Sequence, residues 1–205
     1  MPFRSSMPPG NPKTSSSSSL RSNISFLSRK NIANIYFLDS GDYSEFPDVS
    51  GYEWVRPSQI NWFLDTSRSF KEANGGESVP ALMFFHIPIP EYVFVTSIVG
   101  DKQEDLTSFT PKVNSGLFAA ILEAGDVVAT FVGHSHLNDF CGLHSGIHMC
   151  LGGGVGYHGY GKAGWARRSR IIEIRDDGNS IVTWKRLDDA SFTKVNEQVL
   201  FTKKN

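Results

Sequence analysis

Residues 127–136 read VVATFVGHSH. The apolar run at 127–132 is typical of a buried strand, and the glycine after it permits a sharp turn. Two imidazoles, those of His134 and His136, therefore follow the carboxyl end of a strand. Neutral imidazole is a common metal ligand, so this stretch predicts a strand that presents two candidate metal ligands.

A second apolar run also ends in a histidine. Residues 81–90 read ALMFFHIPIP, and the two prolines stop the strand just after His86 because proline has no N–H donor. Ligands bind outside the carboxyl edge of open α/β sheets, where we expect both strands to end. His86 is therefore the third candidate metal ligand.

The region between these runs predicts a helix. Residues 115–125 read SGLFAAILEAG, with a helical apolar stripe and a glycine suited to ending it. Strand, helix and strand through residues 81–134 form a βαβ unit, and the fold class is α/β with a largely antiparallel second part. The other expected elements are a helix at 57–66 and strands at 34–38, 147–151, 170–174 and 181–187.

The first thirty residues differ from the rest in composition. Prolines and a run of five serines at 15–19 give this part no periodic apolar face to offset the entropy of ordering. We expect a disordered Ser/Pro-rich tail at 1–30 and a folded region at 31–205.

Several stretches together resemble the calcineurin-like metallophosphoesterases, in particular the purple acid phosphatase-like branch that includes plant probable inactive purple acid phosphatases. They follow the family's order within its carboxyl-terminal half: IYFLDSGDY at 35–43, FHIPIPE at 85–91, GHSHLNDFCG at 133–142, GGGVGYH at 152–158 and TWKRLDD at 183–189. The resemblance implies a partial αββα sandwich, in which a mixed sheet with flanking helices forms the second half of the domain.

The resemblance also implies a role for each histidine. In the family, two Fe, Zn or Mn ions activate a hydroxide for in-line attack on a phosphomonoester, either a small molecule or a phosphoprotein. His86 and His134 would bind one ion and His136 the other. The family's remaining ligands come from Asp-x-His, Gly-Asp-x-x-Asp/Tyr and Gly-Asn-His-Asp/Glu motifs, and none of the three occurs in this sequence.

Two functions follow as expectations. The first is a truncated metallophosphoesterase, a hydrolase by family that is inactive as this chain because half of its metal ligands are absent. The alternative is a non-catalytic domain that binds a phosphorylated ligand or a partner. Phe84, Phe85, Phe131 and Val132 lie on strands that meet the missing sheet in the resembled fold, so we expect an exposed apolar face and self-association through it.

Several other residues allow two interpretations. Asp42 resembles a bridging aspartate, but its flanks match a later family strand, which favours a turn residue. Cys141 and Cys150 could bridge neighbouring strands, although buried free thiols are favoured. The arginines at 167, 168 and 170 could meet phosphate, although solvated strand-edge charges are favoured. Glu91 and Asp139 could orient imidazoles.

The glycine-rich stretch at 152–156 could be taken for a phosphate-binding loop. It lacks the Lys and Ser/Thr of a P-loop, so a flexible loop beside the site is favoured. Tyr157, His158 and Tyr160 would then either line a substrate cleft or lie on the surface.

Composition excludes some partners. The net charge is −1 with 40% hydrophobic and 12% aromatic residues, which suits a sizeable core and indicates neither nucleic acid nor an anionic membrane as a partner. The sequence predicts no signal peptide and no membrane span, whereas the resembled relatives often enter the secretory pathway, so the compartment stays open.

Overall fold

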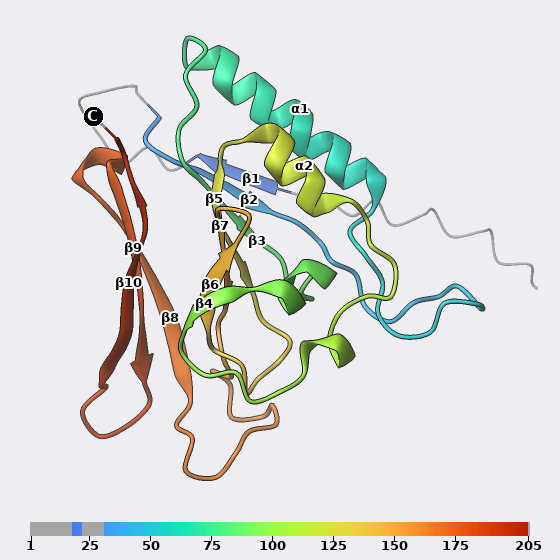
Figure 1. Cartoon of the computed structure of the whole chain (residues 1–205), viewed down its shortest axis with the longest axis vertical. Coiled ribbons are helices and arrows are strands. Elements are labelled where there is room, and N and C mark those ends of the chain that lie inside the picture. The colour runs from blue at the N-terminus through green and yellow to red at the C-terminus, as the bar shows by residue number, and fades with distance from the viewer. Residues whose placement is uncertain (1–17, 22–30, 205) are drawn as a thin grey trace, which may run out of the picture.

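Two β-sheets and two α-helices form the part of the chain that the computed structural model describes, residues 18–21 and 31–204 (Figure 1). The larger sheet has the strand order β1-β2-β3-β5-β7-β6-β4 and the smaller one β10-β9-β8. The strands of the larger sheet, in that order, are Ser18–Arg21, Asn34–Phe37, Ala81–Phe84, Val127–Val132, Ile147–Leu151, Cys141–His144 and Thr96–Val99.

The centre of the larger sheet is parallel. Strands β2, β3, β5 and β7 pair side by side in one direction, and β1, β6 and β4 add antiparallel strands. The predicted βαβ unit is confirmed, since α2 (Leu117–Ala124) connects the parallel neighbours β3 and β5. The carboxyl ends of β3 and β5 consequently meet at one edge, which is where the predicted histidines follow.

Both α-helices lie on one face of this sheet. Helix α1 (Pro57–Ala73) begins with proline in its first turn, as predicted, and extends seven residues beyond the expected end at 66. Phe63 of α1 is fully buried and packs edge-on against Tyr36 of β2, with ring centroids 4.9 Å apart. Helix α2 ends at Gly125, whose φ of +69° is the left-handed conformation that glycine adopts without steric cost.

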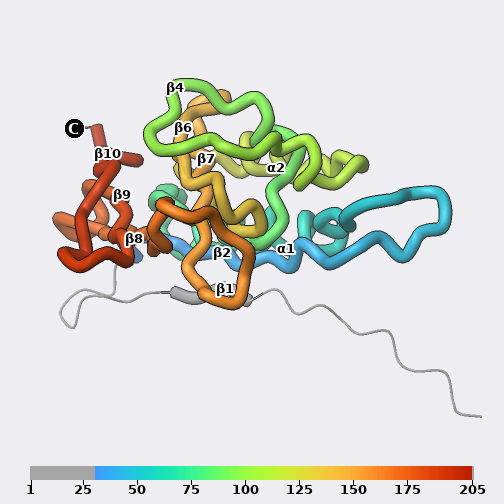
Figure 2. Tube along the Cα trace, turned by 90° about the horizontal axis from the view of Figure 1, so that it is seen from below, coloured from blue at the N-terminus to red at the C-terminus, as the bar shows by residue number. Residues whose placement is uncertain are grey.

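The three-stranded sheet covers part of the opposite face. Its strands are β8 (Arg168–Arg175), β9 (Ser180–Leu187) and β10 (Lys194–Thr202), all antiparallel, and they pack Ile181 and Leu200 against Leu82 and Phe131. Figures 1 and 2 both show the helices and the three-stranded sheet on opposite sides of the larger sheet. The α/β fold with an antiparallel second part is thus as predicted.

Alternation along the strands corrects the expected apolar face. Phe85 and Val132 are buried in the core with the helices, and Phe131 is buried against the three-stranded sheet, so these three are not exposed. Phe84 remains partly exposed and stacks on Phe37 with ring centroids 5.2 Å apart. The exposed apolar surface is therefore smaller than predicted and includes a residue, Phe37, that the prediction did not name.

The two cysteines form a disulfide, so the favoured interpretation as free thiols is wrong. Cys141 on β6 and Cys150 on β7 are register partners in an antiparallel hairpin, and their Cα atoms lie 3.9 Å apart. The turn between the strands places the two side chains directly opposite each other, whereas their nine-residue separation alone left both states open.

The predicted tail at 1–30 lies mostly outside the described residues. Within it the structure describes only Ser18–Arg21, which forms β1 at the edge of the larger sheet beside β2. Short 3-10 helices occur at Pro90–Phe94 (η1), Leu106–Ser108 (η2) and Asp176–Gly178 (η3). None of the helices described is long and apolar enough to cross a membrane.

Candidate metal site

His86 and His134 follow the ends of two adjacent parallel strands and lie side by side. Their ring centroids are 5.2 Å apart, and the backbone N–H of Gly133 donates to the His86 carbonyl at 3.1 Å. A Cβ at Gly133 would lie 3.2 Å from His86 Nδ1, so glycine allows the two strand ends to approach closely. The predicted meeting of these two imidazoles is what the structure shows.

The His134 side chain leaves one ring nitrogen without a partner. Nε2 is buried and forms no hydrogen bond with any of the described residues, and the ring is flanked edge-on by Tyr52 and Phe109 at 4.4 and 5.7 Å between centroids. The residue has a φ of +67°, a conformation that few non-glycine residues adopt. A buried nitrogen without a partner costs free energy, and a bound metal ion would supply that partner.

The electrostatics of the pair favour neutral imidazoles. Burial lowers the pKa of His134, and positive charge on His86 or His136 lowers it further, against the opposing effect of Glu104. The side chain of His86 is exposed on one side, and its partial burial, followed by the charge of His136, also lowers its pKa. Neutral imidazole is the form that binds metal, so both shifts suit a ligand role.

His136 lies on the other side of the turn and is held by the loop after β7. Its ring stacks on that of Tyr160, with centroids 4.1 Å apart and planes 10° from parallel. The Gly154 N–H donates to the His136 carbonyl at 2.8 Å. The glycine-rich stretch at 152–156 therefore lies beside the candidate site. Tyr157, His158 and Tyr160 are all exposed, and Tyr160 also contacts His136.

Glu104 is a site residue that the sequence did not reveal. Its Oε2 accepts hydrogen bonds from Ser135 Oγ at 2.7 Å, the Leu137 N–H at 3.0 Å and the Tyr160 hydroxyl at 2.9 Å. Asn138 accepts the Glu104 N–H at 3.0 Å and so fixes the loop before η2. Glu104 is one acidic residue in a polar loop without a periodic pattern, so the sequence did not indicate these hydrogen bonds.

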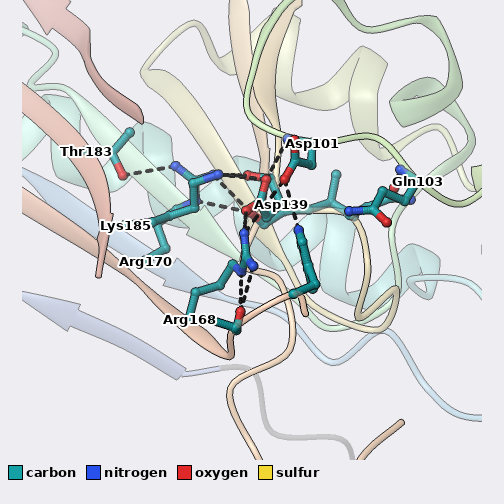
Figure 3. Close-up of polar contacts among 11 residues, drawn as sticks. Asp101, Gln103, Asp139, Arg168, Arg170, Thr183 and Lys185 are labelled. Atoms are coloured by element: carbon teal, nitrogen blue, oxygen red, sulfur yellow. Dashed lines mark hydrogen bonds and ion pairs between the residues drawn. The ribbon is translucent and has the colours of Figure 1, made fainter. Parts of the chain in front are cut away.

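Asp139 does not orient an imidazole. It is fully buried and bonded to cations instead: Lys185 Nζ lies 2.6 Å from its Oδ1, and Arg168 NH1 lies 2.6 Å from its Oδ2 (Figure 3). The Asp101 N–H also donates to Oδ1 at 2.7 Å. This network joins the segment after His136 to β8 and β9 of the smaller sheet.

The favoured interpretation of the arginine cluster as solvated strand-edge charge is wrong for Arg168 and Arg170, and Arg167 also donates to internal acceptors, the carbonyls of Tyr160 and Gly159. Arg168 is buried beside Asp139, whose carboxylate compensates its charge. Its guanidinium carbon Cζ lies 3.4 Å from the centroid of the Trp165 ring. Arg170 donates to the carbonyls of Leu151 and Asp139, at 3.0 and 2.6 Å from NH2. The guanidinium groups of Arg168 and Arg170 thus already have internal acceptors.

Two other acids have local roles. Asp42 Oδ1 accepts the N–H of Tyr43 at 2.8 Å, in agreement with its interpretation as a turn residue. Glu91 accepts from Asn114 at 2.7 Å and is hydrogen-bonded to no imidazole of the described residues, contrary to the suggested orienting role. Within residues 18–21 and 31–204, no group of three or more His, Cys, Asp or Glu side chains is arranged to hold a metal.

No family model matches the chain, whereas several individual proteins are similar to it over most of its length. It is 44% identical over 193 residues to probable inactive purple acid phosphatase 29 of Arabidopsis thaliana, covering 85% of this chain and 49% of the relative. Probable inactive purple acid phosphatase 14 of the same plant is 39% identical, over 85% of this chain and 48% of the relative. Phosphatase DCR2 of Saccharomyces cerevisiae is 37% identical, over 77% of this chain and 29% of the relative. The chain thus spans about half the length of the plant relatives it matches.

Proposed function

Because the chain belongs by homology to the purple acid phosphatase-like metallophosphoesterases, we propose that it forms the imidazole part of a metal-dependent phosphomonoesterase site and is inactive alone. The single observation that supports this most strongly is the pairing of His86 with His134, with ring centroids 5.2 Å apart and a buried His134 Nε2 that has no partner among residues 31–204. Relatives that are 44% and 37% identical to this chain are named a probable inactive purple acid phosphatase and a phosphatase.

The residues fit part of a metal centre. His86 and His134 would hold one ion and His136 a second, of the Fe, Zn or Mn type. Bound metal would lower the pKa of a water molecule and stabilise charge on phosphate oxygens. This chain would bind the metal ions through neutral imidazole nitrogens only. Among the described residues, no carboxylate joins the three imidazoles to bridge two ions or balance their charge.

Arg168 and Arg170 offer a phosphate group no free guanidinium in the part of the chain that the structure describes. Arg168 and Arg170 donate to internal acceptors, so neither is available without breaking a buried hydrogen bond. This argues against a phospholigand-binding module built on the arginine cluster. In the proposed phosphomonoesterase site, the contacts to the substrate would come from groups other than these arginines.

One observation favours partner binding as a second function. A hollow of about 380 Å³ at the carboxyl edge of the sheet is lined by Phe37, Phe84, Phe131 and His86, among others. Phe37, Phe84 and Phe131 stack in a row across three strands, with successive centroids 5.2 and 5.0 Å apart. An apolar row of this kind beside the histidines suits a second copy of the chain or the part of the relatives that this chain does not match.

Zinc titration of the purified chain tests the proposed site. We expect weak binding of the ion at His86 and His134 that His134→Ala abolishes and that His158→Ala, a change at an exposed histidine outside the site, leaves unchanged. Equal affinity in the wild type and His134→Ala would overturn the assignment of these imidazoles.

A further inference from the structure

Tyr160 holds His136 at two points. The His136 N–H donates to the Tyr160 hydroxyl at 2.9 Å, and the two rings stack with centroids 4.1 Å apart. Backbone and side chain of the histidine are thus both in contact with one residue, 24 positions further along the chain. The imidazole therefore has little freedom to rotate.

The backbone carbonyl of Tyr160 defines the protonation of the ring. It lies 2.9 Å from His136 Nδ1, and a carbonyl oxygen can only accept, so in neutral imidazole Nδ1 must bear the hydrogen. Nε2 then has the free lone pair. Arg167 fixes this carbonyl by donating to it from NH1 at 2.8 Å, while NH2 donates to the Gly159 carbonyl at 2.7 Å.

Glu104 completes the arrangement. One carboxylate oxygen, Oε2, accepts from the Tyr160 hydroxyl and from the residues on either side of His136, Ser135 and Leu137. The loop before η2, the turn after β5 and the loop after β7 are consequently joined at a single atom. Charge-assisted bonds of this kind are stronger than neutral ones, so the carboxylate can hold all three segments.

Gly159 leaves space for the ring. A Cβ at this position would lie 2.5 Å from His136 Cε1 and 2.9 Å from Nδ1, closer than real carbon atoms approach. The nearby Gly156 has no atom within 4 Å of the equivalent position. Of these two glycines in one loop, only Gly159 is in contact with the imidazole.

From these contacts we propose that Glu104, Tyr160 and Arg167 are positioning residues that hold His136 in the Nδ1–H tautomer with Nε2 available as a ligand. What Nε2 would bind rests on the proposed function, whereas the tautomer and orientation follow from this chain alone. Partners that fix the second nitrogen of a ligating histidine affect metal affinity by about 10- to 100-fold.

Nitrogen-15 NMR of the metal-free protein tests the tautomer directly. At a pH above the usual titration range of imidazole, we expect His136 to be protonated at Nδ1 and unprotonated at Nε2, with His136→Gln identifying its signals. Gly159→Ala should abolish the single-tautomer signature, and Gly156→Ala should keep it. Tyr160→Phe keeps the backbone carbonyl and the ring but loses the hydroxyl bonds to Glu104 and to the His136 N–H that hold both in place, so it should broaden or mix the tautomers. Cooperative thermal unfolding of each variant would show that it is folded.

A zinc titration of the same variants gives an independent readout. We expect Gly159→Ala and Tyr160→Phe to weaken binding about 10- to 100-fold and Gly156→Ala to leave it unchanged. An Nε2–H tautomer in the wild type, or variants at 159 and 160 that behave like Gly156→Ala in the NMR experiment, would overturn the inference. If the wild type has the expected tautomer but binds no zinc, the positioning inference stands and the proposed metal site fails.

Discussion

Lys185 Nζ lies 2.6 Å from Asp139 Oδ1, and both side chains are fully buried between the two sheets. Burial acts to raise the pKa of Asp139, but the hydrogen bonds from Lys185 and the Asp101 backbone outweigh it and hold the pKa below its usual range. Arg168 donates to the other oxygen at 2.6 Å. The ion cluster is therefore a fixed connection between the segment after His136 and the three-stranded sheet.

Removing the charge of Asp139 should destabilise the fold strongly. Asp139→Asn leaves Lys185 and Arg168 buried without their carboxylate, a loss of about 3–5 kcal/mol in the free energy of unfolding. Urea denaturation of the wild type and of Asp139→Asn measures this loss in the free energy of unfolding. Asp65→Asn is the control, because Asp65 pairs with Arg68 on the surface and its loss should cost under about 1 kcal/mol. Equal effects of the two changes would contradict the account.

The same carboxylate should make stability depend on pH in acid. The pKa of Asp139 is lower in the folded state than in the unfolded chain, so its contribution is present above the unfolded value of about 3.9 and is lost as pH falls through the folded pKa. The difference between wild type and Asp139→Asn should consequently shrink below about pH 4. A difference that stays constant through that range would show that folding does not lower the pKa of Asp139.

The disulfide predicts the thiol count of the protein. Cys141 and Cys150 are bonded to each other and are the only cysteines of the chain. Protein made in an oxidising compartment and denatured without reductant should therefore show no reactive thiol, and reduction should lower its stability by about 2–4 kcal/mol. Two reactive thiols per chain before reduction would contradict the pairing.

The partly exposed pair Phe37 and Phe84 should make the isolated chain self-associate. Phe37 is 37% exposed and forms the outer end of the phenylalanine row. Phe37→Ser should reduce hydrophobic-dye binding and shift the chain toward monomer in light scattering. Phe192→Ser, at a 65% exposed phenylalanine outside that row, should change neither. A monodisperse wild-type monomer without dye binding would show that the row needs no partner.

Metal held by the chain should be scarce and easily removed. Three neutral nitrogens without a carboxylate neither bridge two ions nor balance their charge, and the described residues form no larger ligand group. Elemental analysis should find less than one transition-metal ion per chain, and brief treatment with a chelator should remove it. Two ions that survive the chelator would contradict this expectation.

Sequence patterns were sufficient for the elements that position the histidines. The apolar runs before His86 and Gly133 and the helix between them predict the parallel pair β3 and β5, since period and length decide these elements locally. Glu104, Tyr160 and Lys185 could not be assigned, because their contacts join segments more than twenty residues apart in the chain. The buried arginines were missed for the same reason: the charge that compensates Arg168 is Asp139, 29 positions away.

Phosphatase activity of the purified chain tests the central claim most directly. Hydrolysis of p-nitrophenyl phosphate, measured with Zn²⁺, Mn²⁺ or Fe supplied, should be no faster with wild type than with His134→Ala or His136→Ala purified identically. The reason is that a pair of bridged metals is required to generate hydroxide and stabilise the transferring phosphoryl group. Turnover that the wild type shows and both histidine variants lose would contradict the claim that these imidazoles form only part of a site.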